Sequence, residues 1–292
     1  MASALAPDTP PDAALRQIVA DCQADLLKHR AIVLKSIRPE GIHQTRVALR
    51  RLRAVLGLFQ GAVDGADART VRALSAEARW LAGECAPARD LHVFLTETAS
   101  DVPAIVKRVA NRVARSHLER ARTALAAKRF GDFDRQLTAF TKAIPDPPPI
   151  GRLEEFGRVV LDQRHAKVQH RGHRIEDLDG KQLHRLRIAI KKLRYASTFL
   201  RPAFVGNGFD SPESKAYIDA TERLQSALGA MNDREVAEQM IADIAQAARP
   251  TEAVDKPLAR LARQAASGNK RRRQKLERAW KRFRKTERFW RV

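Results

Sequence analysis

The sequence HQTRVALRRLR at residues 43–53 recurs 141 residues further along the chain as HRLRIAIKKLR at residues 184–194. Each histidine, basic and aliphatic position of the first stretch keeps its chemical class in the second. A fixed internal offset is the signature of a repeated structural unit. The chain is therefore predicted to be a duplication built around two related basic helices.

Helical geometry gathers the basic residues of each stretch on one side. At about 100° per residue, positions 43, 46, 50 and 53 fall within an arc of roughly 80°. A neighbouring arc carries apolar residues and predicts a side that faces a core. The first stripe consists of His43, Arg46, Arg50 and Arg53, and the second stripe consists of His184, Arg187, Lys191 and Arg194.

The two stripes place like charges three and four residues apart with no acidic residue among them. Such spacing costs a few tenths of a kcal/mol per pair in a helix. A single charged helix face usually has no role beyond contact with solvent. Two copies of the same row of like charges, each unfavourable for its helix, indicate selection for an anionic ligand. Arginine binds phosphate oxygens with a fork of donors, and histidine beside anionic oxygens gains a proton.

The composition indicates the same kind of partner. The 292 residues include 55 Lys and Arg against 34 Asp and Glu, so the formal net charge is +21 and the pI is near 10.9. This balance is typical of proteins that meet polyanions or anionic surfaces. The basic excess is densest from Lys270 to the end, and about half of it is spread over the rest of the chain.

Other features argue against several classes of protein. Cys22 and Cys85 have no metal-ligand spacing, which favours buried thiols in a reducing cytoplasm. Residues 1–11 lack the basic segment and apolar run of a signal peptide. No apolar stretch approaches the ~20 residues that a membrane span needs, so we expect no membrane partner.

The apolar periodicity is helical nearly everywhere, which predicts an all-α fold. We expect residues 1–11 to be disordered and residues 12–292 to form one domain of two repeats, 12–143 and 152–292. The proline-rich segment 144–151 is the expected hinge, since consecutive prolines favour polyproline II. Expected helices cover about residues 11–37, 67–85, 88–99, 102–128, 132–143, 152–177 and 181–200. The first basic helix is expected to start at Pro39. After residue 200 we expect two helices that end near residues 230 and 248 and a last helix from Pro257 onward.

A second histidine pair shares the offset of 141 residues, because His29-Arg30 is matched by His170-Arg171. A lone histidine on an apolar helix face is more often a core residue. The recurrence nevertheless adds His29 and His170 to the candidate anion-binding residues.

Metal binding has weaker support. Asp90 and Asp233 are related carboxylates, but each is expected near a helix start, as a capping residue or as an ion-pair partner of a basic helix. His165, His170 and His173 have no nearby acidic or cysteine ligand. We expect no metal and no cofactor.

The last basic segment also carries Trp280, Phe283 and Trp290. Aromatic residues among basic ones can stack nucleic-acid bases. With Leu276 they also form an apolar stripe at helical spacing, and core packing is the favoured reading.

The histidine-led helix, its second copy, and the Arg89-Asp90 and Asn232-Asp233 turns resemble the CHAD family, the conserved histidine α-helical domain. The resemblance covers roughly residues 12–290. It implies an all-helical fold of two pseudo-symmetric four-helix-bundle halves and a basic surface or central channel. It further implies binding of inorganic polyphosphate by the eight stripe residues, often at intracellular granules. This chain departs from the family pattern in having Lys191 and Lys192, which make point-charge rather than forked contacts.

We therefore expect a non-enzymatic, cytoplasmic polyphosphate-binding protein at polyphosphate granules, with granule-associated proteins as further partners. A nucleic-acid-binding protein is the first alternative, because phosphate contacts alone do not separate the two ligands. A metal-dependent phosphohydrolase with histidine ligands is the second. Catalysis is not expected, because no carboxylate lies between His43 and Gln60 or between His184 and Arg201. The sequence also has no Gly-rich phosphate loop, no Gly-x-Ser-x-Gly and no His-Glu-x-x-His motif.

Overall fold

The chain is helical throughout the part that the structure describes. The structure is a computed structural model that describes residues 5–36, 39–63, 65–93, 102–143, 151–205, 211–248, 252–266 and 269–291. Every regular element in these ranges is a helix, which confirms the predicted all-α class.

The first half of the sequence forms the helices α1 (Pro11–Lys35), α2 (Pro39–Leu58), α3 (Gly65–Val93), α4 (Ala104–Ala126) and α5 (Lys128–Lys142). The second half forms α6 (Leu153–Arg171), the short 3-10 helix η2 (Ile175–Asp177), α7 (Gly180–Leu200), α8 (Pro202–Val205), α9 (Pro212–Ala247), α10 (Glu252–Ala266) and α11 (Asn269–Lys285).

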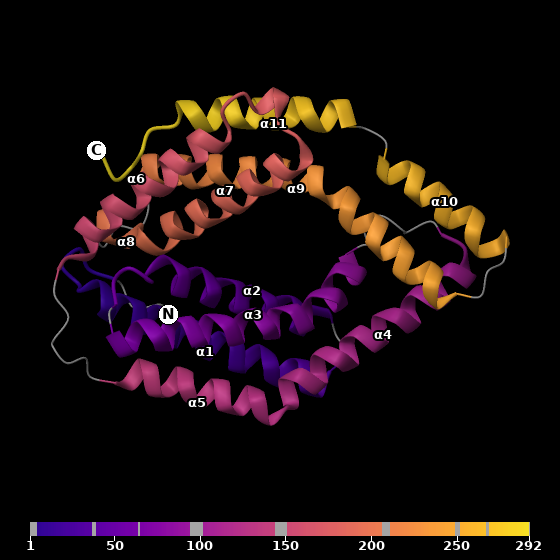
Figure 1. Ribbon diagram of the computed structural model, residues 1–292, viewed down its shortest axis with the longest axis horizontal. Helices are drawn as coiled ribbons and strands as arrows, with labels where there is room; N and C mark the ends of the chain where they lie inside the picture. Colours follow the sequence, from indigo (N-terminus) through magenta and orange to yellow (C-terminus); the bar gives the residue numbers. More distant parts are fainter. Residues whose placement is uncertain are drawn as a thin grey trace.

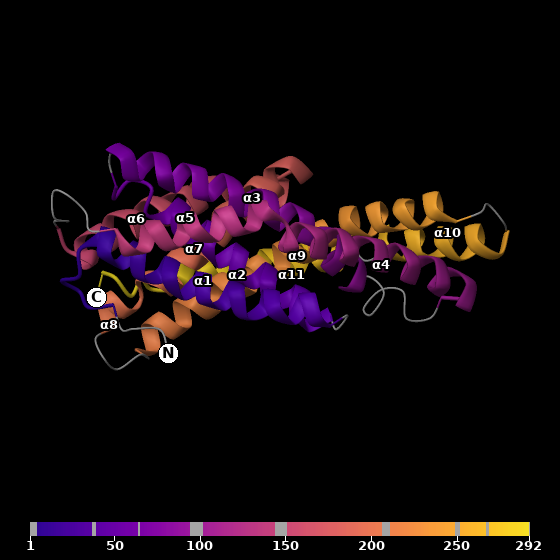
Figure 2. The ribbon, with the colours of Figure 1, turned by 90° about the horizontal axis from the view of Figure 1, so that it is seen from below.

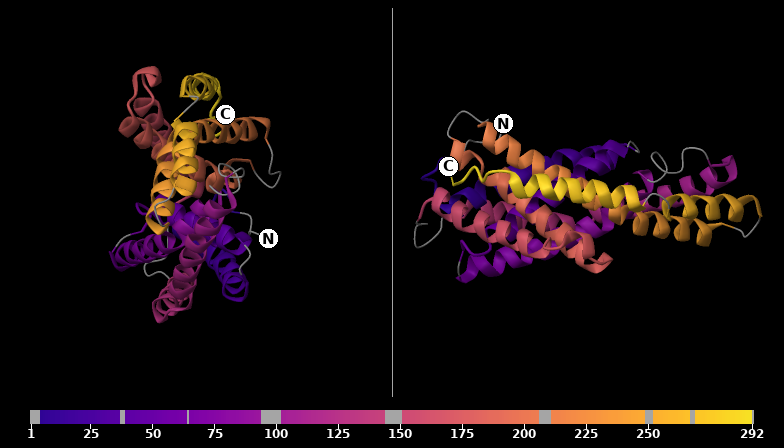
Figure 3. Two further views of the ribbon diagram at one scale, coloured as in Figure 1. Left: turned by 90° about the vertical axis from the view of Figure 1, so that its right-hand side faces the viewer. Right: turned by 90° about the horizontal axis from the view of Figure 1, so that it is seen from above.

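The helices form two groups that lie one above the other in Figure 1. Helices α1, α2, α3 and α5 make one group, and α6, α7, α9 and α11 make the other. The groups meet where α2 contacts α7, which are the helices that carry the two stripes. Helices α4 and α10 and the end of α9 extend beyond both groups at one end of an elongated molecule (Figures 2 and 3). The internal duplication stays a prediction from the sequence.

Two hydrophobic clusters hold this arrangement together. The larger cluster runs through both groups and includes fully buried residues of α2 and α7, among them Leu49, Leu52 and Leu193. The smaller cluster, with Ile244 of α9 and Leu258 of α10, fills the extended end. Because the larger core is continuous, the position of α2 against α7 is fixed by packing on both sides of their contact.

Local interactions set the start of each stripe helix. Helix α7 begins with a capping box, in which the Asp179 carboxylate accepts from the Gln182 backbone N–H at 2.7 Å and the Gln182 amide oxygen accepts from the Asp179 N–H at 2.8 Å. Helix α2 begins at Pro39, a residue well suited to a first turn. Just beyond it, Gly41 lets α2 approach α1 closely, since a Cβ there would lie 3.1 Å from Val33 Cγ2.

An arginine of α6 joins the two groups directly. The Arg164 guanidinium donates to the Lys192 carbonyl of α7 at 2.8 Å and to the Gly57 carbonyl of α2 at 3.2 Å. Burial lowers the pKa of Arg164 to about 10. Both stripe helices are thus tied to the same side chain.

Several of the predicted helix boundaries are wrong. The helix expected over residues 152–177 ends at Arg171, and the last helix, expected from Pro257 onward, is two helices, α10 and α11. The break expected between residues 85 and 88 is absent, because α3 continues through Pro87 to Val93. Cys85, Ala88 and Leu91 lie buried along one side of this stretch, so packing against neighbouring helices stabilises the turn that proline weakens. The break expected near residue 230 is also absent, since α9 runs unbroken to Ala247 with its last part packed in the smaller cluster.

The segment before α1 is folded where the structure describes it, although the sequence predicted disorder for residues 1–11. Leu5 is buried. The Thr9 carbonyl accepts a hydrogen bond from the Leu153 N–H at 2.9 Å, and the Pro7 carbonyl accepts one from the Glu154 N–H at 3.1 Å. These bonds join the N-terminal segment to the start of α6. Most of the expected proline-rich hinge, residues 144–150, lies outside the described residues.

Candidate anion-binding site

The two stripes meet at the contact between α2 and α7. Lys191 of α7 is partly buried, and the charges of Arg46, Arg50 and Arg53 of α2 and of Arg187 of α7 all act on it. Burial, followed by these like charges, lowers the pKa of Lys191 from 10.5 to about 8. The fold therefore brings together five cations from stretches more than a hundred residues apart. We call these five residues the cation cluster.

Arg46 is a member of the cluster with a buried donor that lacks an acceptor among the described residues. Its Nη2 pairs with the Asp90 carboxylate of α3 at 3.1 Å. Its Nη1 is buried and has no hydrogen-bond partner among the described residues. Burial lowers the pKa of Arg46, and Asp90 only partly opposes that effect. A buried charged donor without an acceptor is costly, so this position suits an anionic oxygen.

His43 opens the first stripe and is partly buried. Burial lowers its pKa most, and Arg89 of α3 lowers it further, together with Arg50 and Arg46, while Glu40 acts in the opposite direction. The imidazole is therefore poised to gain a proton when an anion offsets the surrounding positive charge.

Helix α3 adds two cations that sequence reasoning did not include in the site. Arg89 acts on His43, and Arg79 lowers the pKa of Arg53 after the larger effect of burial. Arg89 carried a signal in the sequence, since it belongs to the Arg89-Asp90 pair. Arg79 carried none, because only the packing of α3 on α2 brings it close.

The residues at the two ends of the second stripe, His184 and Arg194, lie in different environments. Its last residue, Arg194, donates to the Glu222 carboxylate at 2.8 Å and to the Gln225 side-chain oxygen at 2.9 Å, both on α9. Its guanidinium also lies 4.9 Å from the centre of the Tyr195 ring. His184 is exposed near the start of α7. Arg194, which was predicted to bind the anion, is thus already paired with the Glu222 carboxylate.

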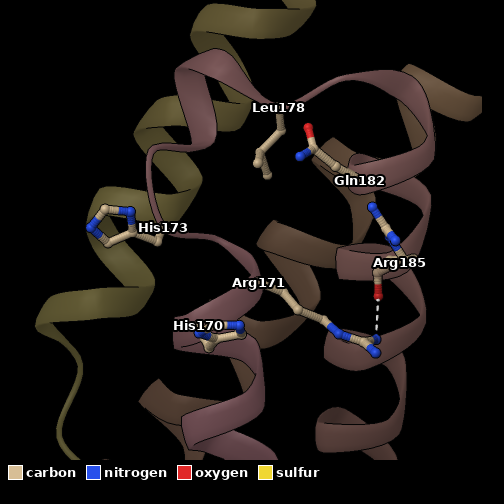
Figure 4. A pocket seen from close by; sticks show the side chains of 6 residues that line it. All are labelled: His170, Arg171, His173, Leu178, Gln182 and Arg185. Atoms are coloured by element: carbon tan, nitrogen blue, oxygen red, sulfur yellow. Dashed lines mark hydrogen bonds between the residues drawn. The ribbon is translucent and has the colours of Figure 1, made fainter.

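The histidines of the second pair lie elsewhere. His29 on α1 is partly buried, and its Nδ1 has no hydrogen-bond partner among the described residues. His170 lies at the end of α6, where it lines a cleft of about 560 Å³ together with His173 and Arg185. Figure 4 shows these side chains around the cleft, with the Arg171 guanidinium donating to the Arg185 carbonyl at 2.9 Å. Among the described residues, no contact links His29 or His170 to the cation cluster.

The aromatic residues of the last segment are core residues. Trp280, Phe283 and Trp290 are buried, and His165 lies among them with its ring centre 5.4 Å from that of Phe283. The His165 Nδ1 is 2.8 Å from the Tyr217 hydroxyl, and burial lowers the pKa of His165 to about 4. Core packing was the favoured reading of these aromatic residues, and the structure places them accordingly.

The structure also shows where the two related carboxylates, Asp90 and Asp233, lie. Asp90 lies in the last turn of α3, so the turn and the helix start predicted at Arg89-Asp90 are absent. Its ion pair with Arg46 is as expected for a partner of a basic helix. Asn232 and Asp233 lie within the continuous α9, so the turn predicted there is absent. Within the described residues, no group of three or more His, Cys, Asp or Glu side chains is arranged to hold a metal ion.

Together these features define the class of the protein, an all-helical molecule with a cationic helix pair where its two helix groups meet. The model of the CHAD domain family matches residues 17–242, and the chain belongs to this family. No protein of curated function matches the chain in sequence. None of the helices in the described ranges is long and apolar enough to cross a membrane.

Two solved structures resemble the chain over nearly its whole length. The crystal structure of the CHAD domain from the plant Ricinus communis has a TM-score of 0.84 and 26% sequence identity, covering 98% of this chain and 96% of that one. PptA from Streptomyces chartreusis has a TM-score of 0.60 and 17% identity, covering 97% of this chain and 100% of that one. The second likeness concerns the fold alone.

Proposed function

We propose that this protein binds inorganic polyphosphate at the cation cluster and does not hydrolyse it. The observation that carries the proposal is the juxtaposition of Lys191 on α7 with Arg46, Arg50 and Arg53 on α2. These cations repel one another in the free protein. A bound polyanion attracts every cation of the cluster, and this attraction offsets the repulsion among them.

A linear chain of phosphates fits this site better than a single small anion does. From His43 to Arg53 the first stripe extends for about 15 Å along α2. Arg50 and Arg53 are exposed, whereas Arg46 is partly buried and keeps an unpaired donor. A flexible polymer with one charge per unit satisfies cations repeated along a helix, and arginine adds forked contacts to its oxygens.

Nucleic acid is the less suitable polyanion. Sequence-tolerant binding of single strands generally uses exposed aromatic side chains on which bases stack. The aromatic residues flagged for this role, Trp280, Phe283 and Trp290, are all buried. These three aromatic residues are therefore not exposed for base stacking, whereas the cluster itself consists of cations that bind phosphate.

The absence of hydrolysis follows from the residue types on the stripes. Phosphoanhydride hydrolysis requires a general base or a metal above an attacking water, and Mg²⁺ is usually held by carboxylates. The stripes carry no carboxylate, and Asp90 is occupied by Arg46. Association with polyphosphate granules in the cytoplasm belongs to the same proposal and rests on family resemblance.

A competition experiment tests the proposal. Labelled long-chain polyphosphate is bound at fixed salt and displaced by unlabelled polyphosphate, duplex DNA, RNA or ATP. We expect polyphosphate to compete best per phosphate. The variant Arg50→Gln/Lys191→Gln should bind roughly tenfold more weakly or worse, because charged hydrogen-bond donors are lost.

The matched control is Arg108→Gln/Arg112→Gln, which removes two charges from exposed positions on α4. It should keep nearly the affinity of the unmodified protein, so the comparison separates a local site from net charge. Equal loss of affinity in both variants, or tighter binding of duplex DNA than of polyphosphate, would refute the proposal.

A further inference from the structure

A second cationic cleft, of about 1300 Å³, lies between α9 and α11. Helix α11 runs along the outer side of the upper group in Figure 1, away from α2. The cleft is therefore separate from the cation cluster. Its principal basic residues are Arg223 of α9 and Arg271, Lys275, Arg278 and Arg282 of α11.

Five basic residues of α11 line the cleft, and all of them except Arg272 form a row along it. The numbers of these four residues increase by four, three and four, which keeps them on one side of a helix. The row extends for about 16 Å. All four side chains are exposed, and such like charges at helical spacing destabilise α11. The row therefore repeats, on a third helix, the charge spacing of the two stripes.

The carboxylates of the cleft do not neutralise this row. Asp219 and Glu222 of α9 line the opposite side. Glu222 already accepts a hydrogen bond from Arg194 of α7 at 2.8 Å, so its charge is directed toward the second stripe. Basic residues remain in excess along the length of the cleft.

Helix α11 packs on the core with this row exposed. Its apolar side is buried through Leu276, Trp280 and Phe283. Trp280 packs so closely on Gly172 that a Cβ there would collide with the indole ring. Arg273 donates to the Leu178 carbonyl at 3.1 Å. Because the aromatic rings face the core, the cleft offers its ligand charged donors without a surface for base stacking.

We propose that this cleft is a second polyphosphate-binding site, so that one protein molecule holds two polyphosphate segments. This inference rests on the proposed function of the cation cluster. Two sites that have no residue in common permit bridging of separate chains. They also strengthen binding of one long chain, because the second contact forms at a high effective concentration.

The test is a calorimetric titration with a polyphosphate chain too short to reach from one site to the other. We expect two chains per molecule of unmodified protein. The cleft variant Lys275→Gln/Arg278→Gln should bind one chain, and so should the cluster variant Arg50→Gln/Lys191→Gln. The two sets of substitutions combined should abolish binding.

The matched control on the same helix is Lys270→Gln/Lys281→Gln, which removes two exposed charges that do not line the cleft. It should still bind two chains, with circular dichroism confirming unchanged helix content in every variant.

A single chain per unmodified protein, unaffected by the cleft substitutions, would overturn the second site and leave the proposed function standing. Absence of any polyphosphate binding would overturn both. Loss of RNA binding by a cleft variant that still takes up two polyphosphate chains would show that the cleft serves nucleic acid instead.

Discussion

The partly buried Lys191 of the cation cluster predicts that polyphosphate binding weakens as the pH rises above neutrality. In the free protein, burial and the charges of Arg50, Arg187, Arg53 and Arg46 lower the pKa of Lys191 from 10.5 to about 8. This drop corresponds to a cost of about 3 kcal/mol for the charged form. A bound polyanion offsets the neighbouring charges, so the pKa of Lys191 should rise toward its ordinary value and binding should take up a proton.

The magnitude follows from the two protonation states. With a pKa of about 8, Lys191 is roughly nine-tenths charged at pH 7 and roughly one-tenth charged at pH 9 in the free protein. If the bound form stays charged, affinity should fall about tenfold between these pH values. The Lys191→Arg variant remains charged throughout and should show a nearly flat profile.

The assay is anisotropy of labelled polyphosphate at constant ionic strength between pH 7 and pH 9.5. Calorimetry in two buffers of different ionisation enthalpy measures the proton uptake directly. An equal fall of affinity in Lys191→Arg would refute the reasoning, because another group would then carry the pH dependence.

Stability of the free protein should change in the opposite direction. The folded pKa of Lys191 lies below its unfolded value, so the unfolded state binds more protons between about pH 8 and pH 10.5. The charge of Lys191 therefore destabilises the folded protein below pH 8, and this penalty is relieved as the pH rises through that window. Urea unfolding of the protein without ligand should show the rise, and Lys191→Arg should not.

Four further predictions concern the same region. Arg46→Ala/Arg50→Ala should weaken polyphosphate binding about as much as Arg187→Ala/Lys191→Ala, and loss of helical circular dichroism in place of loss of affinity would show that the stripes are structural. Affinity should fall steeply and linearly on a log–log plot against salt, as counterion release requires, and a flat plot would argue against an electrostatic site. Arg164→Met should lower the free energy of unfolding in urea by about 2 kcal/mol through its lost bonds to two carbonyls, and an unchanged midpoint would show that the link between the helix groups is dispensable. No sustained phosphate release should accompany binding with Mg²⁺ or Mn²⁺ at pH 6 to 8, and turnover lost with the stripe histidines would identify an enzyme.

The sequence predicted the helical class and the two basic helices because both are local properties. Periodicity and charge spacing within α2 and α7 depend only on residues that are neighbours along the chain. Two of the helix boundaries that failed, at Pro87 in α3 and near residue 230 in α9, are places where tertiary packing outweighs local propensity. Similarly, the assignment of Trp280 and Phe283 to the core followed from their helical spacing.

The sequence by itself therefore determined which residues carry positive charge and on which side of each helix they lie. Only the tertiary structure decided which of these charges meet. Contact between α2 and α7 places Lys191 among the arginines of the first stripe, and packing of α3 adds Arg79 and Arg89. Pairing with Glu222 directs Arg194 toward α9 instead. The physical reason is that electrostatic interactions depend on distance and burial, and both are set by long-range packing that a repeat in the sequence does not specify.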